Sequence, residues 1–493
     1  MTEKVYIESQ NTLPVYDECD ILVVGGGAAG HSAAIAAARA GAKNIILMER
    51  YGYMGGDVTG GYVIMVPKLS WYDKSFVRGL QEEWFTRLNP IPNAVLGPDL
   101  SKIGKDDDQA LLNIWEKIHG CVSESQPKRL VRAVYYEPNQ LKIEMDKMLL
   151  EHKDAIRVMC HTWGTKPIME GNEVKGVIFE SKEGRKAIYA KTVIDATGDG
   201  DILRQTGAPF STLADGKTRS STTALVWRIG GMNQDLYYEW QKANPKEYAA
   251  LRENIAKIAG FRAAPLPSAQ NDVCWVNNWH PNRDCATIKD ATETEMNTRN
   301  TMRDVLDYLK EACPVAFRNS FILDIAPQLG TRGSCRLKGE YIMTANDFAF
   351  ATKHDDVIAW HSTICMINDC GPVEIPYRAL LPQKIENLLA PGRHISSDNV
   401  AIDWLNLIPQ CVGTGQAAGV AAAVATADGV NVRSVDVNKV QNVLIDQDVP
   451  LPRNDRVDKS YTEVCEAHEY GLYTELAKKA RSEADGLKEY RQW

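Results

Sequence analysis

Three glycines near the start of the chain have the spacing that binds the phosphates of a dinucleotide. Gly25, Gly27 and Gly30 form a G-x-G-x-x-G pattern directly after the short apolar run 21–24. In this pattern the first glycine makes a tight turn, the second lets the backbone approach a pyrophosphate, and the third lets a helix pack closely on a strand. The chemistry that these residues support is therefore the binding of a nucleotide cofactor.

A strand, a helix and a second strand must position these glycines. The sequence predicts strands over 21–24 and 45–47, with an alanine-rich helix between them. Ala28 and Ala29 open that helix, whose N-terminus offers unpaired N–H groups and a positive dipole to phosphate. Glu49 closes the second strand, about 20 residues after the glycines, where a carboxylate can accept hydrogen bonds from ribose hydroxyls. A glycine-rich turn in an unrelated loop could have the same residue pattern, but the strand, helix, second strand and Glu49 around it favour a dinucleotide site.

Three further glycine-rich stretches indicate which dinucleotide is bound. Their exposed N–H groups could follow a second phosphate and the edge of a large ring. The residues expected to contact the cofactor are Arg50, Gly55 and Gly56 in the first stretch, Ala196, Thr197, Gly198 and Asp199 in the second, and Gly392 and Arg393 in the third. A predicted helix starting near Val412 follows, and Gly413 and Gly415 would let its N–H groups face a ring carbonyl. Several strand-end loops that converge on one ligand fit FAD better than NAD.

Together these motifs resemble those of a known family. From the first glycine pattern to about residue 450, the chain is similar to the FAD-dependent oxidoreductase family that includes the flavoprotein subunit of heterodisulfide reductase. It is distantly similar to the fumarate reductase and succinate dehydrogenase flavoproteins. The motifs that carry the resemblance are GGGAAG (25–30), ERYGYMGG (49–56), DATGDGD (195–201), GTRGSCRLKGEYIMTANDF (330–348) and the stretch from IPYRALLP through LAPGR to GTGQAAG (375–419).

The resemblance implies an α/β fold with two lobes. An FAD-binding Rossmann-like domain of the glutathione reductase or fumarate reductase type would carry an inserted α+β substrate domain. The expected bounds are 15–75, 140–215 and 375–430 for the FAD-binding domain, 76–139 for a helical excursion, 216–374 for the substrate domain and 431–493 for a C-terminal helical appendage. The length agrees, because 493 residues exceed what one core usually holds. The sequence also predicts amphipathic helices over 99–120 and 286–312.

Composition limits the class of partner and the compartment. The chain has 44% hydrophobic residues, 24% charged residues and a formal net charge of −8. This acidity argues against nucleic acid or an anionic membrane surface as a partner, since both select a basic face. No apolar run approaches the roughly 18 residues of a membrane helix, and the first residues lack the pattern of a signal peptide. We therefore expect a cytoplasmic protein whose tail after residue 448 is a surface appendage or a contact in a homo-oligomer.

The eleven cysteines are scattered along the chain and form no CxxC pair. An iron–sulfur cluster, a zinc site or a dithiol centre is therefore not expected, and we predict no bound metal. Cys365 and Cys370 are close enough in sequence to suggest a redox pair, although buried free thiols are commoner. With one complete dinucleotide fingerprint and no cluster, the flavin must exchange electrons with an external donor or acceptor.

Flavin chemistry also needs a group that exchanges protons and groups that hold the substrate. Arg332 and Arg336 carry over from the family motif, while Gly333 and Cys335 depart from it. An arginine over a flavin can clamp a carboxylate or, in the fumarate reductase relatives, deliver a proton. His361 is the strongest candidate acid or base, since an imidazole pKa of about 6.5 suits proton transfer at neutral pH. Structural ion pairing by the arginines and a structural role for the histidine remain open.

Aromatic residues suggest the type of substrate. Trp279, Trp360 and Trp404 fall in the expected substrate domain or beside the flavin motifs, where they suit a planar or cationic organic molecule. Asp403 could pair with a substrate cation, and Arg378 could clamp a carboxylate at the return to the FAD-binding domain. Large aromatic residues also fill cores, and Asp403 could equally cap the segment after it.

The motifs and the resemblance together predict an FAD-dependent oxidoreductase. The expected reaction is that of a dehydrogenase or oxidase, in which a hydride moves between a small organic substrate and N5 of the flavin. One alternative is an FAD-dependent reductase of an activated double bond, driven by an external donor. Another is a flavoprotein subunit that passes electrons within a complex.

Overall fold

A seven-stranded, mostly parallel sheet forms the centre of the protein. The computed structural model describes residues 4–67, 69–123, 127–212, 223–281, 283–362, 372–399, 401–452, 456 and 458–466. The sheet has the order β8-β2-β1-β11-β10-β9, with β22 paired to β11. Its strands are β1 (Val15–Val24), β2 (Ile45–Met48), β8 (Ile156–Met159), β9 (Trp163–Glu170), β10 (Glu173–Ser181), β11 (Gly184–Asp195) and β22 (Leu388–Leu389). The β1, β2, β8, β11 and β22 strands are parallel, so their carboxyl ends lie at the same edge of the sheet.

Two nearly buried helices, α1 (Ala28–Arg39) and α11 (Ile408–Asp428), pack against each other beside this sheet. Small side chains allow that contact: a Cβ on Gly415 would lie 2.2 Å from the Ala29 carbonyl oxygen, and one on Gly419 would lie 2.0 Å from that of Ala33. The expected start of α11 near Val412 was wrong by about one turn, because the helix begins at Ile408 with Pro409 in its first turn. Gly413 and Gly415 therefore lie inside the helix.

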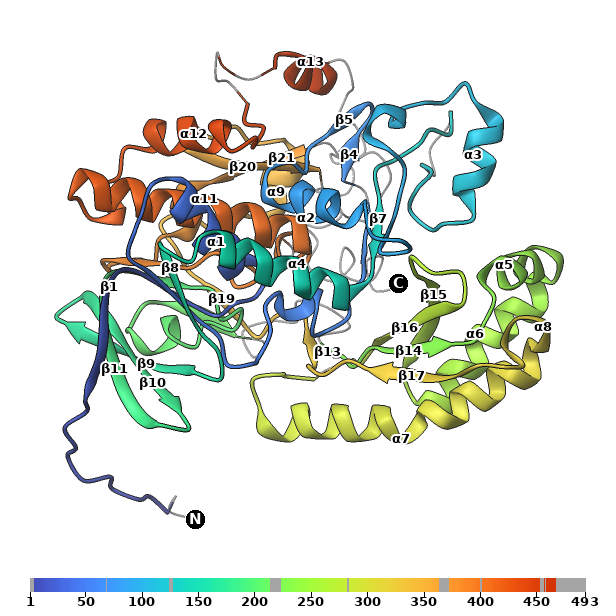
Figure 1. Ribbon diagram of the computed structural model, residues 1–493, viewed down its shortest axis with the longest axis horizontal. Helices are drawn as coiled ribbons and strands as arrows, with labels where there is room; N and C mark the ends of the chain where they lie inside the picture. The colour runs from blue at the N-terminus through green and yellow to red at the C-terminus, as the bar shows by residue number, and fades with distance from the viewer. Residues whose placement is uncertain are drawn as a thin grey trace.

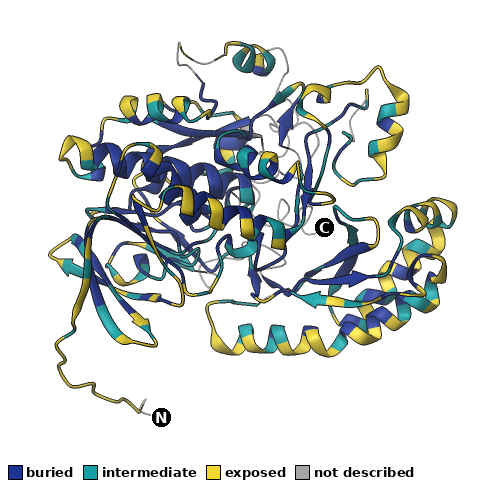
Figure 2. Cartoon of the chain, in the orientation of Figure 1, coloured by how far each residue is buried: buried dark blue, intermediate teal, exposed yellow. Residues whose placement is uncertain are grey.

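A second lobe lies to one side of this layer, at the lower right of Figure 1. It contains an antiparallel sheet of order β15-β16-β14-β17 backed by helices. Its elements are β14 (Trp227–Gly230), α5 (Gln234–Ala243), α6 (Pro245–Ala259), β15 (Arg262–Pro267), β16 (Val273–Trp279), α7 (Ile288–Ala312), α8 (Pro314–Phe317) and β17 (Phe321–Ile325). The helix predicted over 286–312 is confirmed as α7, which turns one face to the lobe and the other to solvent (Figure 2).

The segment expected to be a helical excursion has mixed structure. It contains α2 (Leu80–Leu88), β6 (Val95–Leu96), η2 (Leu100–Lys102), α3 (Gln109–Glu116) and β7 (Val134–Tyr136), and β6 and β7 form a sheet with β3 (Met65–Val66). The amphipathic helix predicted over 99–120, with Asp106 to Asp108 as its solvated start, is shorter in the structure, where α3 covers Gln109–Glu116. The helix begins only at Gln109, because the Asp108 side chain accepts a hydrogen bond from the Leu111 N–H at 2.9 Å and caps it there. The expected domain bounds remain predictions.

The remaining elements are short or peripheral. They are η1 (Gly56–Val58), β4 (Ser70–Trp71), β5 (Lys74–Ser75), α4 (Pro138–Glu151), η3 (Leu203–Gln205), β12 (Phe210–Thr212), β13 (Thr223–Ala224), β18 (Gly330–Thr331), β19 (Cys335–Leu337), α9 (Ala345–Ala349), β20 (Val357–Ser362), β21 (Pro372–Pro376), η5 (Tyr377–Leu380), α10 (Ile402–Leu405), η6 (Val432–Ser434), α12 (Val437–Asp446) and α13 (Ser460–Glu466). The suggested pair Cys365 and Cys370 and the charged end of the predicted C-terminal appendage lie outside the described residues.

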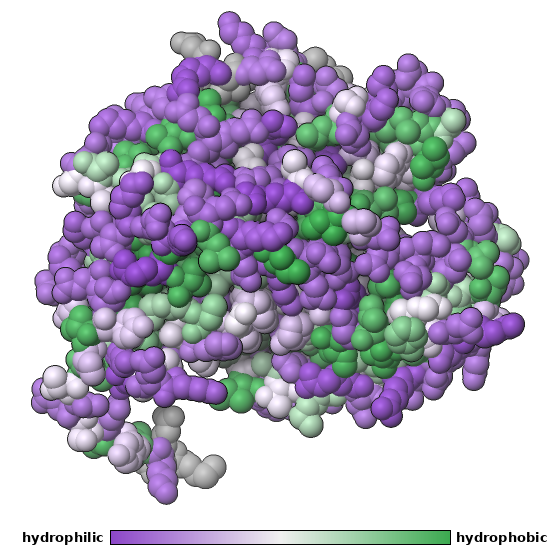
Figure 3. Space-filling model, viewed as in Figure 1, coloured by the Kyte–Doolittle hydropathy of each residue, from purple (hydrophilic) through white to green (hydrophobic). Residues whose placement is uncertain are grey.

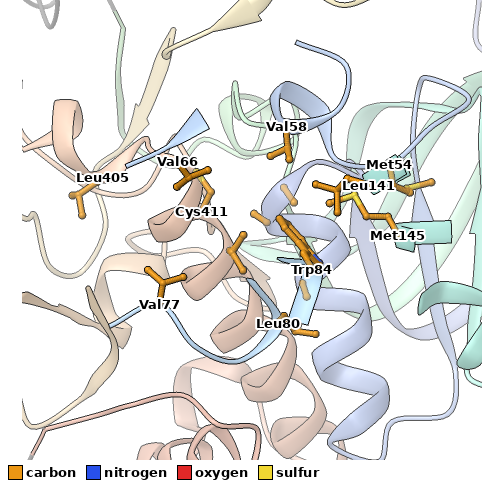
Figure 4. Packing of buried hydrophobic residues seen from close by; sticks show 14 of the residues in the cluster. Met54, Val58, Val66, Val77, Leu80, Trp84, Leu141, Met145, Leu405 and Cys411 are labelled. Atoms are coloured by element: carbon orange, nitrogen blue, oxygen red, sulfur yellow. The ribbon is translucent and has the colours of Figure 1, made fainter. Parts of the chain in front are cut away.

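One large apolar core joins the sheet, the helices and the glycine-rich loop after β2. Residues from this loop, α2, α4 and α11 pack together in Figure 4, among them Met54, Val58, Leu80, Trp84, Leu141, Met145 and Cys411. The face seen in Figure 3 is mainly hydrophilic, with apolar patches between the polar areas. Among the described residues, no helix has the length and apolar character that crossing a membrane requires, and no cluster of side chains suits a metal ion.

Candidate functional site

The glycine turn between β1 and α1 has the geometry of a phosphate-binding loop. Gly25 has φ +99°, and a Cβ there would lie 2.6 Å from the Ala196 carbonyl oxygen. A Cβ on Gly30 would lie 1.7 Å from the carbonyl oxygen of Gly25, so only glycine lets the helix approach the turn. Around Gly27 the space is open, since the nearest atom to an added Cβ is the Gly56 Cα at 4.0 Å. The three glycines thus have the separate tasks that the pattern predicts, and Gly27 faces free space at the start of α1.

Glu49 lies at the end of β2 beside this turn. Its Oε2 accepts a hydrogen bond from the Gly26 N–H at 2.6 Å, and its Oε1 accepts one from the Tyr51 N–H at 2.8 Å. Burial raises the pKa of Glu49, and the two backbone donors oppose that effect. Each carboxylate oxygen keeps a lone pair for another donor, so the side chain is held in place and still able to accept a ribose hydroxyl.

A pocket of about 870 Å³ runs along the carboxyl edge of the sheet, over the start of α1. Most of the predicted cofactor residues line it: Gly25, Gly27, Ala28, Ala29, Glu49, Arg50, Gly55, Gly56, Ala196, Thr197, Gly198, Gly392 and Arg393. Loops after β1, β2, β11 and β22 therefore bring segments from distant parts of the chain to one cavity.

The other four predicted cofactor residues lie behind the wall of this pocket. Gly30 lies at the close contact between α1 and the turn after β1, and Asp199 accepts a hydrogen bond from Arg393. Gly415 packs on Ala29, and Gly413 packs on His361, so both shape α11 without lining the cavity. The cofactor role of all these residues stays a prediction.

Arg393 is the most strongly held charge in the wall. Its Nη1 donates to Asp57 Oδ2 at 3.0 Å, its Nη2 to Asp199 Oδ2 at 2.8 Å, and its Nε to the Gly198 carbonyl at 2.9 Å. The side chain is 12% exposed. These contacts tie the β22 loop to the glycine-rich loop and to the β11 loop, while Ser334 donates to Asp199 from the segment that returns from the second lobe.

The two carboxylates around Arg393 differ in pKa. Burial raises the pKa of Asp57, against the opposing charge of Arg393. Burial acts in the same direction on Asp199, but Arg393 and the Ser334 hydroxyl outweigh it and lower the pKa of Asp199. Asp199 is therefore the firm counterion of the guanidinium, and Asp57 is the more readily protonated of the two.

The sequence did not predict several residues in the pocket wall. They are Tyr51, Asp57, Val58, Thr162, Trp163, Gly164, Asp201, Gln328, Asn406, Ile408 and Cys411, besides the strand ends Val24 and Met48. Asp57 directly follows the motif ERYGYMGG and Asp201 ends the motif DATGDGD, so both could have been chosen by their charge. Trp163 and Gln328 reach the cavity through the fold alone, and no local pattern marks them.

His361 lies in β20, against α11 and away from the pocket lining. Its side chain is buried, and a Cβ on Gly413 would lie 2.1 Å from its Nε2. Burial lowers its pKa to about 4, with a small opposing effect from the Phe76 backbone. This placement favours the structural interpretation that the sequence left open. His394 is likewise fully buried beside Asp195.

Adding a methyl group at Gly413 should expose the tight fit of His361. We expect Gly413→Ala to lower the free energy of unfolding by about 1–3 kcal/mol through overpacking. His361→Ala would free that space, so the double variant should lose less stability than the sum of the single losses. Urea unfolding of the four proteins measures this coupling, and strictly additive losses would contradict the contact.

The three predicted substrate-clamping arginines lie in different surroundings. Arg336 is buried in β19 and donates to Asn399. Arg378 is exposed and pairs with Asp356 at 2.9 Å. Arg332 is half-buried and close enough to Asp57 to lower its pKa. None of the three lines the pocket, although the Arg332 carbonyl accepts a hydrogen bond from pocket residue Asn406 at 2.6 Å. Arg332 is thus the one that lies nearest to the site.

The predicted aromatic wall is dispersed. Trp360 packs edge-on against Phe76 at 4.7 Å between ring centres, and Trp404 packs on Phe348 at 4.3 Å. Trp279, at the end of β16, lies under the Arg262 guanidinium at 4.7 Å. Asp403 is half-buried in α10 beside Trp404. These residues do not line the pocket, so their role as substrate contacts stays a prediction.

The open turn at Gly27 and the buried acceptor Glu49 fit the pyrophosphate and ribose of FAD. The family model described as FAD dependent oxidoreductase matches residues 20–444. A urocanate reductase from Eggerthella lenta is 45% identical over 58 residues, which make up 12% of this chain and 9% of that enzyme.

Solved structures of similar shape are remote in sequence. A geranylgeranyl bacteriochlorophyll reductase-like protein from Thermoplasma acidophilum has a TM-score of 0.42 at 14% identity, over 94% of this chain and 91% of the other. A p-nitrophenol 4-monooxygenase from Pseudomonas putida has a TM-score of 0.44 at 10% identity, over 97% and 94% of the two chains. The family model spans most of the sequence and confirms the predicted resemblance: the chain belongs to the FAD dependent oxidoreductase family.

Proposed function

We propose that this protein is a dehydrogenase or oxidase that transfers a hydride between a small organic substrate and FAD. The observation that supports this proposal is the course of the pocket. Its wall includes Glu49 and Trp163, the N-terminus of α1, and Asp57, Gln328 and Asn406, and Gln328 belongs to the segment that follows β17 of the second lobe. A cofactor with its ribose at Glu49 would therefore have its far end at the seam between the lobes.

The chain's own residues would bind and orient the reactants. Gly27 and the first turn of α1 hold the pyrophosphate, and Glu49 accepts the ribose hydroxyls. Arg393, fixed by two carboxylates, keeps the far wall rigid. When bound, FAD supplies the two-electron chemistry that these side chains lack. Gln328, which comes from the second lobe, would close the site from the substrate side.

The visible absorption spectrum of the purified protein tests the cofactor, read again on the supernatant after denaturation. We expect two flavin bands that move into the supernatant as noncovalent FAD. Anaerobic bleaching of the longer-wavelength band by members of a panel of amines and alcohols would then support the dehydrogenase or oxidase reaction. A protein that takes up no flavin even after incubation with FAD would refute the proposal.

A second candidate function is an FAD-dependent reductase of an activated double bond. The short match to a urocanate reductase favours it, since that relative is named for the reduction of such a substrate. The two candidate functions differ in which half-reaction with the substrate is fast: reoxidation of the reduced flavin for a reductase, or reduction of the oxidised flavin for a dehydrogenase. Protein reduced beforehand by dithionite and mixed with an α,β-unsaturated acid would recover its flavin bands quickly if it is a reductase. A dehydrogenase would instead be bleached by its substrate and reoxidised by an external acceptor.

A further inference from the structure

The proposed reaction requires a group that exchanges a proton beside the cofactor, and the sequence-based candidate is badly placed. His361 does not line the pocket, and its imidazole is buried against α11. The proton-exchanging group should instead be sought among the side chains in the pocket wall. Those that carry titratable or charged groups are Glu49, Arg50, Tyr51, Asp57, Asp201, Arg393 and Cys411.

These groups divide between the two ends of the pocket. Glu49 and Arg50 follow β2, the Arg50 guanidinium lies over the Trp163 ring at 5.7 Å, and Asp201 accepts a hydrogen bond from the Trp163 indole at 3.4 Å. We therefore assign these three residues to the ribose end. Asp57 and Arg393 are ion-paired to each other at the opposite end, next to Gln328 from the second lobe. An arginine stays protonated in proteins. Burial raises the pKa of the Cys411 thiol to about 12, so this thiol stays protonated at neutral pH, and Asp57 is the carboxyl group next to Gln328.

Asp57 is held in a fixed position from two sides. Its Oδ2 accepts from Arg393 at 3.0 Å, and its Oδ1 accepts from the Gln328 side-chain amide at 3.1 Å. The Gln328 oxygen in turn accepts from the Tyr53 hydroxyl at 3.4 Å. Asp57 is the middle residue of the short helical turn η1, which begins at Gly56 and has Gly55 as its N-cap. Its side chain is still 21% exposed, so it is ordered without being sealed from the cavity.

We propose that the Asp57 carboxyl group exchanges the substrate proton during hydride transfer. This assignment rests on the proposed function. In oxidation, the substrate gives a hydride with its two electrons to FAD, and the O–H or N–H proton passes to the Asp57 carboxylate. In reduction of a double bond, the hydride goes from the reduced cofactor to one carbon, and Asp57 gives its proton to the other. An external electron acceptor or donor completes the cycle in each case.

The surroundings of Asp57 allow both of its protonation states. The charged or titratable groups that act on it are Arg393, Arg332, Asp199, Tyr53, Tyr136 and Cys411. Burial and Asp199 raise the pKa of Asp57, while Arg393 and Arg332 lower it. A carboxyl group with opposing influences of this kind can be tuned toward neutral pH, where general acid–base catalysis is most effective.

The first test measures whether Asp57 lies beside the reacting end of FAD, and it requires no substrate. Bound FAD is brought to redox equilibrium with a reference dye, and the ratio of reduced to oxidised FAD is measured in the wild type and in Asp57→Asn. Removing a nearby negative charge should shift that equilibrium toward reduced FAD by about tenfold at pH 7. The difference in this equilibrium between the two proteins should disappear as the pH falls through the pKa of Asp57, because the wild-type carboxyl group is then also neutral. Asp57→Glu keeps the charge and should behave like the wild type.

Asp201→Asn is the matched control, since it removes a carboxylate that lines the same pocket at the ribose end. Its dye equilibrium should change much less than that of Asp57→Asn. An Asp57→Asn protein that binds FAD and shows no shift would overturn the assignment, and so would an equal shift in the control.

The second test measures proton transfer itself. With the amine, alcohol or unsaturated acid that reacts fastest with the wild type, Asp57→Asn should slow flavin reduction or reoxidation by roughly 10²–10⁴-fold at unchanged FAD content. Unchanged kinetics would remove Asp57 from the reaction even if the dye equilibrium shifts. A wild type that binds no FAD would instead refute the proposed function, so the two failures can be told apart.

Discussion

Replacing Arg393 by methionine is expected to lower the free energy of unfolding by about 3–5 kcal/mol. Methionine has a similar length but no charge, so Asp57 and Asp199 would face each other in a largely buried site without their shared guanidinium. The loss comes mainly from leaving these carboxylates uncompensated, because their desolvation is no longer offset by an ion pair. Urea unfolding at fixed FAD concentration, together with unfolding of the apoprotein, measures this loss.

The loss should depend on pH in a defined direction. Without Arg393 both carboxyl groups would bind protons more tightly in the folded state than in the unfolded chain. The folded variant then holds more protons, so its stability falls as pH rises and recovers in acid. In the wild type the lowered pKa of Asp199 acts the other way, and its contribution to stability is lost as pH falls through that pKa. The difference between the two proteins in free energy of unfolding should therefore be widest near neutral pH and become smaller as the pH falls.

Arg378→Met is the matched control for this prediction. Arg378 pairs with Asp356 at 2.9 Å, but its side chain is 49% exposed and solvent screens the pair. We expect a loss of no more than about 1 kcal/mol. Equal losses at the two positions would mean that the buried network around Arg393 contributes no more than a surface ion pair.

The cofactor end of the site could be predicted from sequence because local rules set it. The turn at Gly25, the open backbone at Gly27 and the contact at Gly30 all lie within one strand–turn–helix unit. The family motifs extended the prediction to the loops at Gly198 and Gly392, which line the same pocket. The family is confirmed by the family model over residues 20–444, and the fold class by the mostly parallel sheet.

The substrate end could not be predicted in the same way because burial and pairing there join distant parts of the chain. The sequence shows His361 as an ionisable residue but does not show that Gly413 of α11 packs against its ring. It shows Arg393 next to Gly392 but not the partner Asp57, which is 336 positions away. Gln328 arrives from the second lobe by way of the chain after β17. Tertiary packing, which residue type alone does not reveal, decides which groups reach the cavity, so the assigned catalytic and substrate-binding roles stay predictions.

The charged cluster of Arg393, Asp57 and Asp199 also connects the two lobes. Arg393 pairs with both carboxylates at the carboxyl edge of the central sheet. From the segments adjoining the second lobe, Ser334 donates a hydrogen bond to Asp199 and Gln328 donates one to Asp57. The charged cluster is thus both a wall of the pocket and a joint between the lobes. A change in the position of the second lobe would alter the donors around Asp57 directly, so substrate binding at the seam and proton exchange at Asp57 would be coupled.

Two alanine substitutions in the glycine turn should separate cofactor binding from folding. Gly27→Ala is expected to leave the apoprotein folded, because Gly27 has φ −65°, which alanine adopts, and an added Cβ would lie no closer than 4.0 Å to Gly56. The cost at this helix start should stay within about 1 kcal/mol. The methyl group would nevertheless occupy the space where the backbone should meet a pyrophosphate. Losing one charge-assisted hydrogen bond costs about 1.5–3 kcal/mol, so FAD affinity should fall roughly 10- to 100-fold.

Gly30→Ala should instead damage the fold itself. Its Cβ would lie 1.7 Å from the Gly25 carbonyl oxygen, and because that atom is backbone, α1 would have to move off β1. We expect the apoprotein to lose about 1–3 kcal/mol of stability or more, and its FAD affinity to fall as a consequence. Thermal unfolding of both apoproteins and titration with FAD followed by quenching of flavin fluorescence measure the two effects. Wild-type affinity in a folded Gly27→Ala protein would mean that this turn does not hold the pyrophosphate, because the open space at Gly27 would then serve neither packing nor phosphate binding.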